Sequence, residues 1–308
     1  MRRSAIVFVL AACASSAAQG QMFAARSVIA VPLDDTSKVS GFLPAFYYAA
    51  ELQRGWQSAG DDRAWDARFV GTIEMWRSKS QRTSFLIISG DEMVANDRKD
   101  GGFNPRGISW ELDGAVVQRF RATALELAIV HYCRHEIDNV DPPGPAYYVP
   151  GYTPTERTIS LNGFRLQVMA PQVSWRGQTH VRAAFGGEVF GHAWDGRNPK
   201  TSVVNSWSQA RGAGRLVLRV DQNFIGRSTL FARGFGLGML FREDENAPVV
   251  AGMQSVHRFE VGIHLPGSAG ALELYGATEH TFDDLNTPAP RPSRVTGIGL
   301  RLTARDQF

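Results

Sequence analysis

The last residues of this chain constrain its fold more than any other stretch. Apolar and polar residues alternate one by one through residues 298–304, and the chain stops on an aromatic residue, Phe308. Such alternation gives a β-strand one apolar and one polar face, so the two faces meet different surroundings. At the other end, Arg2 and Arg3 precede the apolar run 5–12, which is the pattern of a secretory signal. We therefore expect an exported protein built from two-faced strands.

The signal has two interpretations. Small residues at 16–18 suit cleavage by a signal peptidase, which gives a signal peptide over residues 1–18 and a mature chain over 19–308. Alternatively, residues 10–13 look like a lipobox, in which Cys13 would carry a lipid. Under the first interpretation the mature chain keeps a single cysteine, Cys133, so it has no internal disulfide.

Segments of about ten alternating residues recur along the chain, the length that a tilted strand needs to cross a bilayer. The clearest lie at 108–116, 181–189, 228–241 and 258–265. No apolar run after the signal reaches the ~20 residues of a membrane helix, so a membrane-spanning form must be a closed barrel. Its polar face would then point inward and carry the charged residues Glu126, Arg182, Glu188, Arg215, Arg219, Arg258 and Glu260.

The connections between these segments alternate in length. Short or fairly short turns are expected at 78–82, 120–121, 170–178, 222–227 and 266–270. Longer polar stretches lie between them, at 90–107, 137–156, 192–212, 242–252 and 280–293. An early strand in 46–52, within the weakly patterned region 22–62, brings the total to about twelve, an even number as in bacterial barrels.

An exported chain of alternating strands that ends on Phe308 resembles a Gram-negative outer-membrane β-barrel. The resemblance implies a single closed antiparallel barrel in the bacterial outer membrane, in contact with outer-membrane lipid. It also implies assembly by the barrel-assembly machinery, through the C-terminal strand ending at Phe308. The alternative fold is a soluble secreted β protein. A net charge of +3 with no basic cluster speaks against a nucleic-acid partner.

The segment 124–136 departs from the usual strand composition. His131, Cys133 and His135 continue the face that begins with Leu127 and Ile129, and the loop count places them at the outer rim. Ionisable groups are costly in the middle of a bilayer but tolerable at its edge.

This rim stretch resembles the His-x-Ser motif of the outer-membrane phospholipase A and lipid A deacylase families. The resemblance implies that His131 is the base and that Cys133 stands at the nucleophile position, where those families have serine. Residues at i and i+2 of a strand lie on one face within reach of each other. Asn139, Asn162 and Glu156 are candidates for the group that orients the histidine.

A second resemblance covers residues 116–308. The stretch 131–139 is similar to the His-x-Ser-x-His-x-x-Asp-Glu stretch of an uncharacterised bacterial envelope family, and the strand 272–276 with the glycine-bearing last strand fits it as well. That family has no assigned activity, so this resemblance implies the fold alone.

Three interpretations of the rim residues remain open. The two histidines can belong to an interfacial girdle, His131 and Cys133 can be an acyl hydrolase site, or His131, Cys133 and His135 can offer a weak metal site. His192 and His280, also near the rim, could complete either site. No cofactor motif is present. The sequence favours a non-catalytic barrel with a charged, plugged interior, and the alternative is an outer-leaflet lipid acyl hydrolase using Cys133 and His131.

Overall fold

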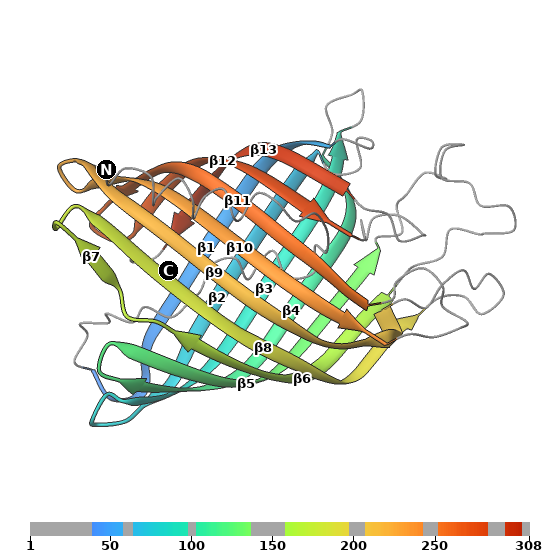
Figure 1. The fold of residues 1–308 in the computed structure, drawn as a ribbon, viewed down its shortest axis with the longest axis horizontal. Helices are drawn as coiled ribbons and strands as arrows, with labels where there is room; N and C mark the ends of the chain where they lie inside the picture. Colours follow the sequence, from blue (N-terminus) through green and yellow to red (C-terminus); the bar gives the residue numbers. More distant parts are fainter. Residues whose placement is uncertain are drawn as a thin grey trace, which may run out of the picture.

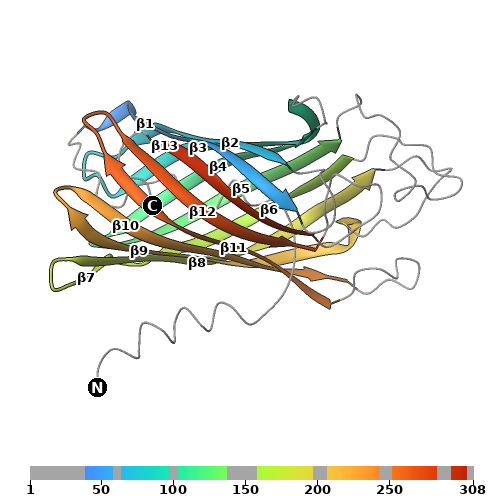
Figure 2. The same cartoon turned by 90° about the horizontal axis from the view of Figure 1, so that it is seen from above.

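The computed structural model is a single antiparallel β-barrel (Figures 1 and 2). It describes residues 39–57, 64–97, 103–136, 158–196, 207–242, 252–282 and 293–303. The expected signal segment 1–18, Cys13 and Phe308 lie outside these residues. No helix in the described part of the chain is long and apolar enough to cross a membrane.

Twelve long strands form the wall, and each pairs with the strands before and after it. The first and last strands pair from Ala49↔Thr303 to Gln57↔Val295, which closes the ring. The strands are β1 (Gly41–Gln57), β2 (Trp65–Arg77), β3 (Thr83–Asp97), β4 (Phe103–Phe120), β5 (Thr123–Glu136), β6 (Thr158–Met169), β8 (Thr179–Gly196), β9 (Ala210–Ile225), β10 (Ser228–Phe241), β11 (Gly252–Pro266), β12 (Ala271–Thr281) and β13 (Ser293–Thr303). The closed barrel of twelve strands confirms the fold prediction and excludes the two-sheet sandwich.

Two short elements complete the described chain. The three-residue strand β7 (Val173–Trp175) pairs only with the start of β8, inside the turn expected at 170–178. A single turn of 3-10 helix, η3 (Trp207–Gln209), precedes β9. The connections that follow β2, β4, β6, β9 and β11 lie at one end of the barrel, which we call the turn end, and we call the other end the loop end.

Two expected long loops are wrong in their extent. In the loop expected at 192–212, β8 continues to Gly196 and β9 begins at Ala210. Residues 90–107 were expected to connect two strands, but β3 continues to Asp97 and β4 begins at Phe103. The stretch is polar because part of it faces the barrel interior: Glu92 is buried and accepts hydrogen bonds from Arg68. Charge therefore marks the inner face of a strand here and does not mark a loop.

The outer wall is apolar, and the inner face combines buried charged groups with an apolar cluster that includes Leu86, Ile88 and Val130. On β5 and β6, Leu127, Ile129, Phe164 and Leu166 point outward and are more than half exposed. Their neighbours along the strands, such as Glu126 and Arg165, are buried inside. This is the distribution of a barrel that meets hydrocarbon on its outside, as expected from the alternation.

Strand β10 carries most of its large apolar residues on the inner face. Its large apolar residues Phe231, Phe235, Leu237, Met239 and Phe241 are buried inside the barrel. Its outward face carries the exposed Leu230 and Leu240 near its ends and Ala232, Gly234, Gly236 and Gly238 between them. The bulky face of β10 thus fills the interior beside the polar groups, and alternation alone did not reveal which face would point inward.

The orientation of β10 can be tested with two adjacent positions. Phe235→Ala is expected to lower the free energy of unfolding by about 3–5 kcal/mol, because it leaves a cavity in the packed interior. Gly234→Ala is expected to change it by less than about 0.5 kcal/mol, because a Cβ there meets no atom within 4 Å. Urea unfolding in detergent micelles, followed by tryptophan fluorescence, measures both. Equal losses in the two variants would contradict the orientation.

Candidate functional site

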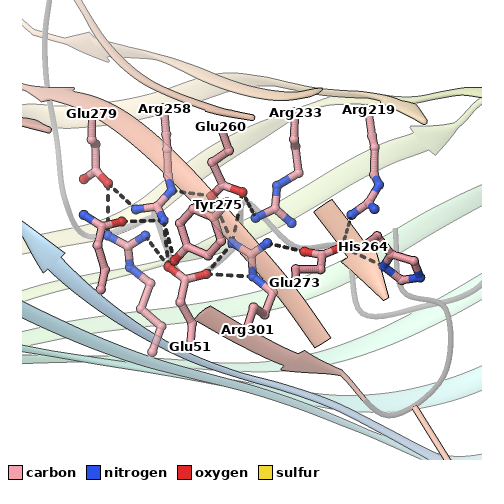
Figure 3. A network of polar contacts seen from close by, with 12 residues as sticks. Glu51, Arg219, Arg233, Arg258, Glu260, His264, Glu273, Tyr275, Glu279 and Arg301 are labelled. Carbon is pink, nitrogen blue, oxygen red and sulfur yellow. Dashed lines mark hydrogen bonds and ion pairs between the residues drawn. The ribbon is translucent and has the colours of Figure 1, made fainter. Parts of the chain in front are cut away.

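An ion-pair network fills the interior next to the seam where β1 meets β13 (Figure 3). Arg301 donates from Nε to Glu51 over 2.7 Å, from Nη1 to Glu273 over 2.6 Å and from Nη2 to Glu260 over 2.9 Å. Arg258 donates to Glu51 over 2.7 Å and to Glu260 over 2.6 Å. Each charge therefore has several partners, as buried charges require.

The network reaches further around the wall. Arg68 of β2 joins Glu51 at 3.1 Å and Glu279 at 3.0 Å, and Arg219 of β9 joins Glu273 at 2.6 Å. The ring of Tyr275 lies under Arg301, with 4.7 Å between the guanidinium carbon and the ring centroid. Strands on opposite sides of the seam are thus tied through the interior.

A second network lies inside β4, β5, β6 and β8. Arg165 is fully buried and lies 2.6 Å from Asp113 and 2.8 Å from Glu126. Its Nη1 also donates to the hydroxyl of Tyr132, which donates in turn to Glu188 over 2.9 Å. The interior charges expected from the sequence are confirmed: six of the seven are buried, and Arg182 is half-buried and pairs with Asp221 at 2.9 Å.

An aromatic cluster fills the interior near the loop end. Trp207 of η3 is fully buried and stacks on Phe282, with ring centroids 5.0 Å apart. Phe241, the last residue of β10, meets both rings edge-on at 5.7 Å and 5.3 Å. Charged side chains, aromatic rings and aliphatic side chains such as Leu86 and Ile88 occupy the described interior.

The polar rim residues gather on the outer wall, where β5, β6 and β8 approach the loop end. His131, Cys133 and His135 of β5 share the outward face with Leu127 and Ile129, as expected. Facing them from the neighbouring strands are Thr158, Ser160 and Asn162 of β6 and His192 of β8, which is register-paired with Asn162. We call these seven residues the rim patch.

The hydrogen bonds within the rim patch differ from the expected pairing. Cys133 Sγ lies 2.8 Å from Nε2 of His135, and His131 Nδ1 lies 2.7 Å from Oδ1 of Asn162. His135 Nδ1 is 3.2 Å from the hydroxyl of Thr158. The thiol therefore meets His135, whereas the sequence had paired it with His131. Asn162, one of the three residues expected to orient the histidine, contacts His131.

The remaining candidates are distributed as follows. Asn139 and Glu156 lie outside the described residues. His280 is on β12, across the barrel from the rim patch, and pairs with His257. In the described part of the chain, no three His, Cys, Asp or Glu side chains are placed to hold a metal ion. Cys133 is a free, half-buried thiol.

Sequence reasoning missed Thr158 and Ser160. The signal was present: Thr158, Ser160 and Asn162 alternate on β6 immediately before the outward Phe164 and Leu166. A polar run at the start of an apolar strand face marks the point where that face leaves the hydrocarbon.

Tryptophans bracket the outer wall at two levels. Trp110 and Trp194 point outward in the register row that contains Cys133 and Ser160, near the loop end. Trp76 and Trp175 point outward beside the turns, and all four are at least two-fifths exposed. Tryptophan prefers the membrane–water interface, so the Cys133 row lies at interfacial depth.

Comparisons with solved structures return barrels of the same general kind. The chain is similar to the outer membrane phospholipase of Salmonella typhi, a dimer with bound calcium (12% identity, TM-score 0.40, covering 88% of this chain and 94% of that one). It is also similar to the translocator domain of the autotransporter NalP from Neisseria meningitidis (11%, 0.40, 88% and 90%). The transport unit of the autotransporter AIDA-I from Escherichia coli is a third example (10%, 0.37, 91% and 95%). Likeness at this level does not extend to function. No protein-family model and no curated protein matches the sequence.

The ion-pair network predicts a large effect of one substitution. Arg301→Met leaves Glu51, Glu260 and Glu273 without their shared cation, so the free energy of unfolding is expected to fall by about 3–5 kcal/mol. Arg227→Met, at an exposed turn position, is the matched control and is expected to change it by less than about 0.5 kcal/mol. Urea titration in micelles distinguishes the two. A loss in Arg301→Met as small as the control's would show that the network does not stabilise the fold.

Proposed function

We propose that the protein is an outer-membrane barrel of the bacterial envelope with a plugged, non-conducting interior. The observation that carries this proposal is the burial of the central charges. Arg258, Arg301 and Glu260 are each at most 2% exposed, and each is held by several partners. A conducting pore would leave such groups hydrated.

The placement in the outer membrane is supported by the outer wall. Its apolar face and its two tryptophan levels match a bilayer-spanning barrel, and an exported chain of this kind contacts outer-membrane lipid. Assembly by the barrel-assembly machinery through the C-terminal strand belongs to the same proposal. Membrane fractionation tests the location: recovery of the protein in the soluble periplasmic fraction would overturn it.

The plugged interior predicts the absence of channel activity. Purified protein in a planar lipid bilayer is expected to give no stable single-channel steps above background, because ion pairs and aromatic rings fill the lumen. A porin reconstituted in the same bilayer serves as the positive control. Large, stable single-channel currents from the wild-type protein would refute the plugged interior.

A second candidate function is hydrolysis of lipid acyl esters at the outer leaflet. The observation that favours it is the pair of contacts in the rim patch, a thiol 2.8 Å from an imidazole and a second imidazole 2.7 Å from a carboxamide. Nucleophile and base within hydrogen-bond reach are the basis of covalent catalysis. The thiol shares a register row with Trp110 and Trp194, which supports a position near the interface, where ester groups of lipids lie.

In this candidate mechanism, His135 Nε2 takes the proton of the Cys133 thiol as the sulfur attacks the ester carbonyl carbon. Collapse of the tetrahedral adduct breaks the ester C–O bond, and the imidazolium returns the proton to the departing alcohol. Water, activated by the same imidazole, then hydrolyses the thioester and releases the fatty acid. Thr158 accepts a hydrogen bond from His135 Nδ1 and so holds the required tautomer. The sequence had assigned the role of base to His131.

Hydrolysis of phospholipid and of lipid A in mixed micelles tests this candidate. Cys133→Ala is expected to abolish turnover, and Cys133→Ser is expected to retain part of it. His135→Gln is expected to lower kcat by about 10²–10⁴-fold, the usual contribution of a general base. His131→Gln is the matched comparison, and a larger loss there would return the role of base to His131. Equal rates in wild type and Cys133→Ala would reject the hydrolase.

A further inference from the structure

Three basic side chains lie together on the outer wall, across the barrel from the rim patch. His257 of β11 is register-paired with His280 of β12, and His280 is register-paired with Arg294 of β13. The two imidazole rings have centroids 5.7 Å apart, and Arg294 is exposed. Their neighbours along the strands, Arg258 and Glu279, are buried inside, so the three basic groups point outward. We call them the basic row.

The outward surface around the basic row carries little compensating charge, because Glu279, which acts electrostatically on His257, is buried inside. On the described outward faces of β11, β12 and β13 there is no carboxylate, and Glu279 faces the interior network. Arg294 is close enough to act electrostatically on both imidazoles. His280 is partly buried, and its imidazole also has a hydrogen bond with the backbone of Thr281. An anion bound at this face would balance the charge of the exposed Arg294.

The basic row also lies at a definite depth. Trp56 of β1 points outward, is 55% exposed, and shares a register row with Thr296 of β13. Arg294 is two residues nearer the loop end than Thr296, which is about 7 Å along a strand. Because tryptophan marks the interface, the basic row lies on its aqueous side, where lipid headgroups lie.

Directly below the basic row Thr278 and Thr296 point outward, and beyond them the wall becomes apolar. Toward the turn end, the outward face of β11 carries Phe259, Val261, Ile263 and Leu265, and that of β13 carries Ile298, Leu300 and Leu302. The basic row above the apolar part of the wall is complementary to a lipid with an anionic headgroup and acyl chains. Arginine forms bidentate hydrogen bonds with phosphate, and imidazole N–H groups add single donors.

We propose that His257, His280 and Arg294 bind the phosphate group of an acylated outer-leaflet lipid. The proposal rests on the proposed outer-membrane location. The lipid stays in its leaflet, with its acyl chains along β11 to β13 and its phosphate beside Arg294. This site is separate from the rim patch, and binding of the lipid there involves no catalytic step.

Binding of defined lipids to the purified protein in detergent micelles tests the basic row, with native mass spectrometry as the readout. The probes are lipid A with both phosphates, the same lipid without phosphates, and inorganic phosphate. Wild type is expected to bind phosphorylated lipid A at least tenfold more tightly than the dephosphorylated lipid. Arg294→Gln and the double variant His257→Gln/His280→Gln are expected to lose at least tenfold in affinity for the phosphorylated lipid.

Arg242→Gln is the matched control, since it removes an exposed cation after the end of β10 and is expected to keep wild-type affinity within twofold. Equal binding of the two lipid A forms, or wild-type affinity in Arg294→Gln, would overturn the site. Inorganic phosphate that binds as tightly as lipid A would overturn the lipid assignment. Binding in micelles is independent of cellular location, so failure here and failure of fractionation are separate results.

Discussion

The rest of the barrel depends on the hydrogen bonds that the carboxylate of Glu51 accepts. This carboxylate accepts hydrogen bonds from Arg68 of β2, Arg258 of β11 and Arg301 of β13. Glu51 and Arg301 are 250 residues apart in the sequence, on the first and last strands, so their contact lies at the seam that closes the ring. A buried carboxylate without partners is costly, and it therefore favours the one register in which all three guanidiniums reach it.

A barrel stabilised from the inside has consequences for where function can reside. The inward positions of most strands are occupied by buried ion pairs or by packed apolar and aromatic side chains. The outer wall below the rim must remain apolar because ionisable groups in the bilayer centre are costly. Polar chemistry is therefore confined to the outward positions nearest the strand ends. Both polar clusters on the wall obey this constraint, the rim patch on β5, β6 and β8 and the basic row on β11, β12 and β13.

Much of the fold could be predicted from the sequence because period-two alternation is a local property. It gave the strand count and the inward direction of residues such as Glu188 and Arg219. The alternation did not predict the structure correctly where a charged residue is buried inside the barrel or where large apolar residues point inward. The polar residues 90–97 resemble a loop because Glu92 is charged, yet its partner Arg68 makes it an interior residue. On β10, large residues alternate with glycine, and only packing against the other strands decides which face points inward.

The contents of the rim patch were partly predictable, but its pairing was not. The spacing of His131, Cys133 and His135 correctly placed all three on one outward face, since strand geometry fixes this locally. Which histidine meets the thiol depends on side-chain rotamers and on cross-strand neighbours, and the register of β5 against β6 brings Thr158 to His135 and Asn162 to His131. A register shift between β6 and β8 follows directly after the row that pairs Asn162 with His192. Register is a long-range property set by the closed ring, and so the same interior ion pairs that close the barrel also decide which groups meet on its outer wall.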